Sequence, residues 1–89
     1  MRKISVAAAG GAEFRVTVEE DGTRTVHDIR VTPADVERYA PGCMPGRLVR
    51  ASMEFLLDRE PKEEILQRFD LQTIEQFFPD YATRIRSLV

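Results

Sequence analysis

Two side chains in this sequence could take part directly in a reaction: the single histidine, His27, and the single cysteine, Cys43. An imidazole can act as a general base or bind a metal ion, and a thiolate beside it can act as a nucleophile. His27 has no second histidine with which to share a metal ion, and the residues around Cys43 supply no cation that would activate a thiol. We therefore expect a hydrogen-bonded structural histidine and an inert loop cysteine, and we expect no catalytic residue, metal ion or cofactor.

Carboxylates crowd the stretch around residue 60, at Asp58, Glu60, Glu63 and Glu64. Oxygen ligands at this density could bind a divalent cation. An arginine and a lysine are interleaved with them, however, so we expect these carboxylates to cap a helix junction and to face solvent. The sequence also has no glycine-rich phosphate loop and no nucleophile elbow, and an enzyme is therefore not expected.

The charge balance bears on nucleic-acid binding. Thirteen Lys and Arg stand against 15 Asp and Glu, a formal net charge of −2, whereas nucleic-acid-binding domains usually carry a basic excess. Residues 62–78 nevertheless follow the pattern of a degenerate helix-turn-helix, although the second helix of that motif would carry no Lys or Arg. Nucleic-acid binding is therefore the alternative hypothesis, with Arg68, Arg84 and Arg86 as the side chains that would contact phosphates.

Three aromatic residues, Phe77, Phe78 and Tyr81, lie within five positions of one another. Large aromatic side chains usually belong to the core of a small domain, but a ring that stays exposed can anchor a partner. The leading prediction is therefore a non-catalytic protein-interaction or self-association module. These three rings would form its contact surface, and its partner would be an unknown protein or a second copy of the chain.

The element expected to organise the domain is a helix at about residues 46–59. Its apolar side chains spread across roughly 200° of the helix, so other elements must pack on two of its sides. With 89 residues the chain is long enough for one domain, which we expect over residues 13–89. Residues 1–12 are predicted to form either a flexible N-terminus or a short edge strand.

The clearest strand signal is a hairpin over residues 13–31. Apolar and polar residues alternate on both sides of Asp21-Gly22, a dipeptide typical of a two-residue type I′ turn. This turn fixes the register, placing Arg15 opposite Asp28 and Val16 opposite His27.

The rest of the chain predicts short helices. Thr32 is the expected N-cap of a helix over Pro33–Tyr39, with Pro33 at the first helical position. Further helices are expected over Pro61–Arg68, over Leu71–Phe78 with Asp70 as its cap, and after Pro79. The predicted fold is α+β: an N-terminal antiparallel β-hairpin, of two or possibly three strands, followed by four or five short helices packed around the helix at 46–59.

The C-terminal half contains the pattern LL-x-REPK-x-x-IL-x-x-FDL-x-x-I-x-x-(Y/F)FP-(E/D)-(Y/F), beginning at Leu56 and ending at Tyr81. It resembles a group of small bacterial proteins of unknown function that share this signature, and the resemblance covers about residues 48–81. The resemblance implies a compact bacterial cytoplasmic domain and assigns no catalytic or binding role to any residue. A cytoplasmic location also fits a single free thiol, and no stretch is long and apolar enough to predict a membrane span.

Overall fold

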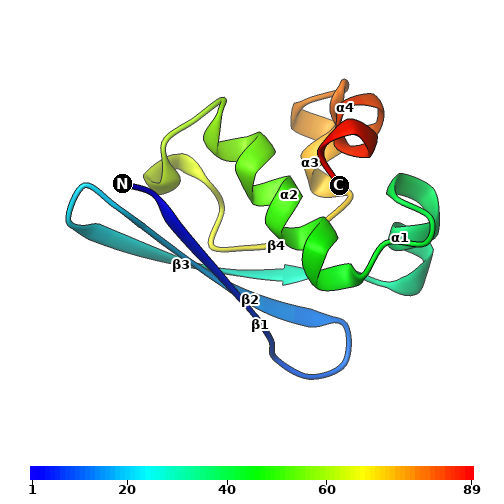
Figure 1. Cartoon of the computed structure of the whole chain (residues 1–89), viewed down its shortest axis with the longest axis horizontal. Coiled ribbons are helices and arrows are strands. Elements are labelled where there is room, and N and C mark those ends of the chain that lie inside the picture. Colours follow the sequence, from blue (N-terminus) through cyan, green and yellow to red (C-terminus); the bar gives the residue numbers. More distant parts are fainter.

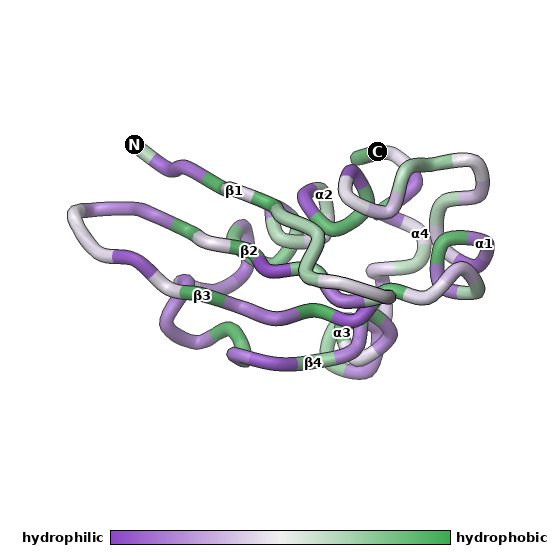
Figure 2. The backbone as a smooth tube through the Cα atoms, turned by 90° about the horizontal axis from the view of Figure 1, so that it is seen from below, coloured by the Kyte–Doolittle hydropathy of each residue, from purple (hydrophilic) through white to green (hydrophobic).

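In the computed structural model, which describes residues 1–89, a four-stranded sheet carries its helices on one face (Figure 1). The strands lie in the order β1-β2-β3-β4, and Figure 2 shows them from the face opposite the helices. The predicted α+β class is therefore confirmed. The elements are β1 (Lys3–Ala8), β2 (Glu13–Glu20), β3 (Thr23–Arg30), α1 (Pro33–Tyr39), α2 (Pro45–Leu57), the 3₁₀ turn η1 (Lys62–Glu64), β4 (Arg68–Asp70), α3 (Thr73–Phe77) and α4 (Tyr81–Leu88).

The β2–β3 hairpin has the predicted register. Arg15 lies opposite Asp28, and its Nε donates to the Asp28 carboxylate at 3.0 Å, which lowers the pKa of that carboxyl. Asp21 and Gly22 have φ values of 57° and 78°, as a type I′ turn requires. Because apolar and polar side chains alternate along β2 and β3, the sheet has one buried face and one face open to solvent.

The N-terminal residues form the edge strand β1, antiparallel to β2. Ile4 and Val6 lie half-buried on the face of the sheet that carries the helices. The Arg50 guanidinium donates to the Ile4 carbonyl at 2.7 Å and so joins this edge to α2. Of the two predicted alternatives for residues 1–12, the structure has the strand.

The predicted start of α1 is present in full. The Asp35 amide donates to Thr32 Oγ1 at 3.2 Å, and the Thr32 amide donates to Asp35 Oδ2 at 2.9 Å. These reciprocal bonds form a capping box that satisfies two amide donors at the helix start. Pro33 occupies the first turn, where its missing N–H is not needed.

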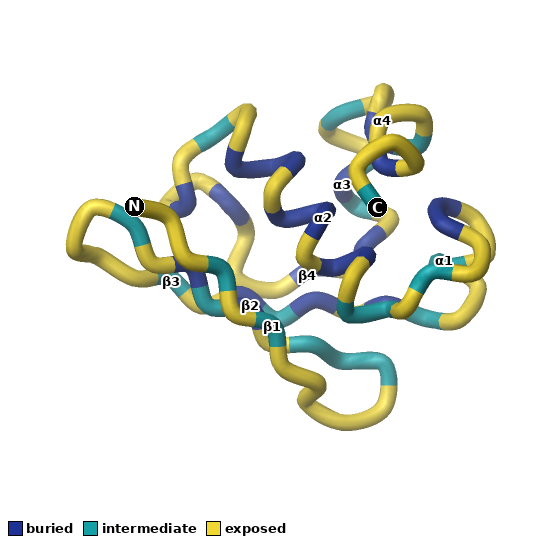
Figure 3. Tube along the Cα trace, in the orientation of Figure 1, coloured by how far each residue is buried: buried dark blue, intermediate teal, exposed yellow.

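Helix α2 lies at the centre of the domain, but the short helices do not all pack around it as predicted, because α3 packs mainly on α4 and β4. Helix α2 contacts β1 and β2 on one side and α1 and α4 on others, so most of its residues are buried (Figure 3). The buried residues of α2 are Leu48, Val49, Ala51, Ser52, Met53, Phe55, Leu56 and Leu57.

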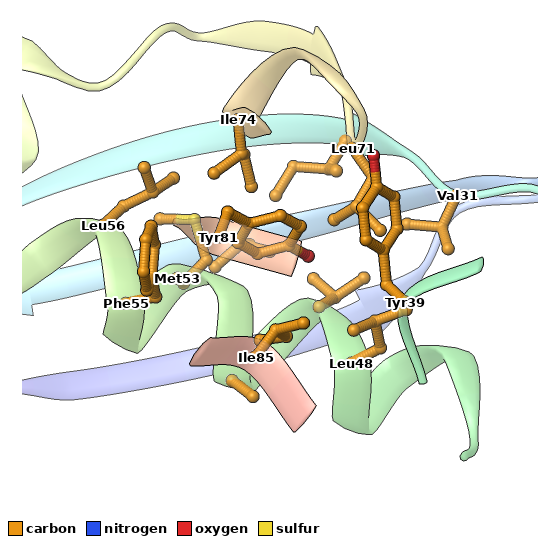
Figure 4. Close-up of a cluster of buried hydrophobic side chains, with 14 of the residues drawn as sticks. Val31, Tyr39, Leu48, Met53, Phe55, Leu56, Leu71, Ile74, Tyr81 and Ile85 are labelled. Carbon is orange, nitrogen blue, oxygen red and sulfur yellow. The ribbon is translucent and has the colours of Figure 1, made fainter. Parts of the chain in front are cut away.

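Tyr81 of α4 lies fully buried beside α2, between Tyr39 and Phe55 (Figure 4). The ring centroids are 5.0 Å from Tyr39 and 5.3 Å from Phe55, in edge-to-face arrangements. Ser52 donates its only hydroxyl proton to the Leu48 carbonyl at 2.7 Å, so the Tyr81 hydroxyl must donate to Ser52 Oγ, also at 2.7 Å. This chain of hydrogen bonds satisfies the hydroxyl, and burial raises the pKa of Tyr81.

The prediction of a helix over Pro61–Arg68 is wrong. A single 3₁₀ turn follows Pro61, and the chain then extends into β4, which pairs with β3 in parallel. Without β4, the outer edge of β3 would be left unpaired. The Asp28 amide donates to the Gln67 carbonyl at 2.7 Å, and the Leu71 amide donates to the Arg30 carbonyl at 3.0 Å. Hydrogen bonding of the open backbone edge of β3 outweighs the local preference of residues 61–68 for helix.

Two smaller differences follow from β4. Asp70 belongs to the strand rather than to a helix cap, and α3 begins only at Thr73, with no side-chain cap. The structure therefore has four strands and four α-helices, compared with the two or three strands and four or five helices expected. None of the helices combines the length and the apolar character that a membrane span requires.

Candidate functional site

A hollow of about 300 Å³ opens between the end of α2, the segment 60–66, β4 and α3; we call it the α2–α3 cleft. Most of its lining is apolar, and it includes side chains that are also part of the domain core. Figure 4 shows two of these, Leu56 from α2 and Ile74 from α3. The lining residues are Leu56, Glu60, Glu64, Ile65, Leu66, Phe69, Thr73, Ile74, Phe77 and Phe78.

Two large apolar side chains of the cleft are held in solvent. Phe77 is 65 % exposed and Leu66 is 50 % exposed. Leu66 points outward because the chain around it is extended, so its neighbour Ile65 takes the buried position. Phe77 is exposed because Ile74 and Phe78, one helical turn apart, form the inner side of α3.

Two carboxylates, Glu60 and Glu64, lie on the cleft, and no salt bridge or hydrogen bond joins either side chain to another part of the chain. Glu60 is half-buried, and burial together with the nearby charge of Glu64 raises the pKa of the Glu60 carboxyl. Three other acidic residues near the cleft, in contrast, have a cationic partner. Those pairs are Arg2–Asp58 at 3.9 Å, Lys62–Glu63 at 2.8 Å and Arg59–Asp80 at 2.7 Å.

The three aromatic residues expected to form a contact surface have different positions. Phe77 is exposed, whereas Phe78 is half-buried and packs edge-to-face on Phe55 with centroids 5.9 Å apart. Tyr81 has no exposed surface and belongs to the core. The prediction of Tyr81 as an interaction residue is therefore wrong, because α4 must bury its apolar side against α2.

His27 and Cys43 are not brought together as a reactive pair. His27 is buried, and its Nδ1 donates to the Leu66 carbonyl at 2.8 Å while Nε2 lies 2.8 Å from Thr25 Oγ1. The Nδ1 bond joins β3 to the segment before β4, and the Nε2 contact with Thr25 stays within β3, so both ring nitrogens have a partner. Cys43 lies half-buried in the loop before α2, with its Sγ 3.4 Å from the Met44 carbonyl.

The crowded carboxylates around residue 60 do not converge. Glu63 turns toward Lys62, whose hydrogen bond lowers the pKa of that carboxyl, and Asp58 faces Arg2. No set of three or more His, Cys, Asp or Glu side chains has a metal-binding arrangement. Only Glu60 and Glu64 remain together, on the cleft.

The helix-turn-helix expected over residues 62–78 is absent, because β4 occupies the place of its first helix. The three arginines proposed to contact phosphates lie on two separate elements, Arg68 on β4 and Arg84 and Arg86 on α4. Arg68 approaches Asp28 at 3.7 Å, and Arg86 donates to the Arg38 carbonyl at 3.2 Å. The nucleic-acid alternative thereby loses the motif that suggested it.

Sequence reasoning missed three members of the cleft: Leu66, Glu60 and Glu64. Leu66 was expected on the inner side of a helix that does not form, and the two glutamates were expected at a helix junction. Pro61 disfavours helical geometry in Glu60, which predicts the end of the preceding helix but not the extended conformation of the segment that follows. The exposure of Leu66 depends on the pairing of β4 with β3 and has no local signal.

Comparison with known proteins adds no relative: no family model, no curated protein and no solved structure matches this chain.

Proposed function

We propose that this chain is a non-catalytic protein-interaction module whose contact surface is the α2–α3 cleft. The observation that carries the proposal is the exposure of Phe77 and Leu66 beside a cleft floored by core residues. Exposed apolar groups around a concave surface are typical of sites that bind another protein.

The size of the cleft favours a side-chain anchor over a small-molecule ligand. Sites that enclose small molecules have volumes of about 300–1,000 Å³, and this cleft lies at the lower limit. One or two large side chains of a partner would fill it. The partner is a second protein or another copy of this chain, and the single thiol of Cys43 fits a cytoplasmic setting.

Site-specific photocrosslinking tests the proposal. A photoreactive phenylalanine analogue would replace Phe77 in one variant and Met44 in a control variant, because Met44 is even more exposed than Phe77 but lies outside the cleft. Both variants would be irradiated in bacterial extract, with and without nuclease treatment. We expect a discrete adduct from position 77 and none from position 44, and an adduct of twice the chain mass would identify self-association.

Two outcomes would contradict the proposal. Identical adducts from both positions would mean that exposure alone explains the contacts. Adducts from position 77 that disappear after nuclease treatment would favour the nucleic-acid alternative.

A further inference from the structure

The negative charge of the α2–α3 cleft favours a partner with a cationic side chain. Glu60 and Glu64 face the cleft without an internal counter-ion, whereas three other acidic residues near the cleft are paired. A polyanion such as a nucleic acid or an anionic lipid surface would bring negative charge against these carboxylates. A cation placed between them would be attracted to both.

The partial burial of Glu60 strengthens the preference of the cleft for a cationic group. Glu60 is half-buried beside apolar side chains, and the cost of holding it charged there is raised further by Glu64. A Lys or Arg of a partner would offset both effects at once and would form charge-assisted hydrogen bonds with the carboxylates. Apolar side chains of the cleft lie next to the same carboxylates, so one ligand segment would contact both.

We propose that the α2–α3 cleft binds a short segment of a partner protein in which a large apolar side chain lies next to a Lys or Arg. The apolar side chain fills the space between Leu66, Phe77 and the core residues below them. The basic side chain pairs with Glu60 and Glu64. This inference rests on the proposed function, because it specifies the partner of the same cleft.

Selection from a library of short random peptides tests the specificity. The full chain would be the bait, and the Phe77→Ala variant would remove peptides that bind elsewhere. The most enriched peptide would then be titrated against wild type, Phe77→Ala and Glu60→Gln/Glu64→Gln by fluorescence anisotropy. The matched control is Glu19→Gln/Glu37→Gln, which removes two exposed carboxylates outside the cleft.

We expect the enriched peptides to contain Lys or Arg beside a large apolar residue. Glu60→Gln/Glu64→Gln should weaken binding about tenfold, which corresponds to about 1.4 kcal/mol. The control should leave the affinity unchanged. The difference between the two double variants should shrink as salt is raised from about 0.1 M to about 1 M, because the Debye length falls from about 10 Å to about 3 Å.

The possible failures are distinguishable. Phe77-dependent peptides that lack a basic residue and bind Glu60→Gln/Glu64→Gln as well as wild type would overturn the inference and leave the proposed function in place. If no peptide depends on Phe77, the proposed function fails, and the inference fails with it.

Discussion

Aromatic residues lie in two different surroundings in this molecule. In the core group, the ring of Tyr81 contacts the rings of Tyr39 and Phe55, and both tyrosine hydroxyls have a hydrogen-bond partner. At the cleft, Phe77 lies open to solvent near two carboxylates that have none. We therefore expect the core group to determine stability, whereas the exposed groups of the proposed contact surface should contribute little to it.

The largest expected change in stability comes from replacing Tyr81, and comparison with Phe77 tests the difference between the core group and the cleft. Tyr81→Ala should lower the free energy of unfolding by about 3–5 kcal/mol, because it removes a fully buried aromatic ring. Phe77→Ala should change it by less than about 0.5 kcal/mol, because the ring is mostly exposed. Urea denaturation followed by circular dichroism measures both, and similar losses from the two variants would contradict the division.

The second prediction concerns the buried hydrogen bonds of the core group. Ser52→Ala should cost about 1–3 kcal/mol, because it leaves the Tyr81 hydroxyl buried without an acceptor. Adding Tyr81→Phe removes the stranded hydroxyl, so the double variant should recover part of this loss. A double-mutant cycle from denaturant melts measures the coupling, and strictly additive effects would show that the bond contributes nothing.

The third prediction uses the two tyrosines of the chain as spectroscopic probes. Burial, with the hydrogen bond to Glu75, raises the pKa of Tyr39 to about 12, and burial also raises the pKa of Tyr81. Because the raised pKa favours the neutral phenol in the folded state, this stabilisation is complete below about pH 10 and is lost as the pH rises toward 12. Absorbance titration should therefore show little tyrosinate at about pH 10 in the folded chain and about half-ionisation in urea. Equal titration curves would place both hydroxyls in solvent.

The smallest expected change in stability comes from replacing Glu60 at the cleft. The pKa of the Glu60 carboxyl is higher in the folded chain than in the unfolded chain. The protonated carboxyl therefore favours the folded state at a pH below the unfolded pKa, and this contribution is lost as the pH rises through the folded pKa. Glu60→Gln should therefore increase stability at neutral pH, by less than about 0.5 kcal/mol, and the gain should vanish below about pH 4. Thermal melts at the two pH values test this. A loss of stability at neutral pH would mean that the Glu60 carboxylate has an internal partner after all.

The sequence was sufficient where the deciding residues are neighbours. The Asp21-Gly22 turn sets the register of the whole hairpin, and Thr32 with Asp35 sets the start of α1. In both cases the hydrogen bonds or backbone angles that matter lie within a few residues of the signal. The apolar pattern of α2 was equally informative, because it required partners on two sides without specifying which elements they are.

The sequence was insufficient where a distant element decides. Ile65, Leu66 and Phe69 have helical spacing, yet the open edge of β3 draws this segment into an extended conformation. No local pattern predicts that Phe77 is exposed while Tyr81 is buried, since both belong to the same predicted series of short helices. Which ring enters the core depends on how α4 packs against α2 and how α3 packs against α4 and β4, and thus on the completed fold.

The pairing of β4 with β3 has a consequence for the order of folding. His27 and Leu66, joined by a hydrogen bond, are 39 residues apart in the chain, whereas the β2–β3 hairpin closes through a two-residue turn. Closing a long loop costs more conformational entropy than closing a short one, so non-local pairing forms slowly. During synthesis the hairpin can form while the C-terminal half is still absent. The cleft would then be among the last parts of the molecule to form, and a nascent chain would complete the proposed contact surface only after the hairpin.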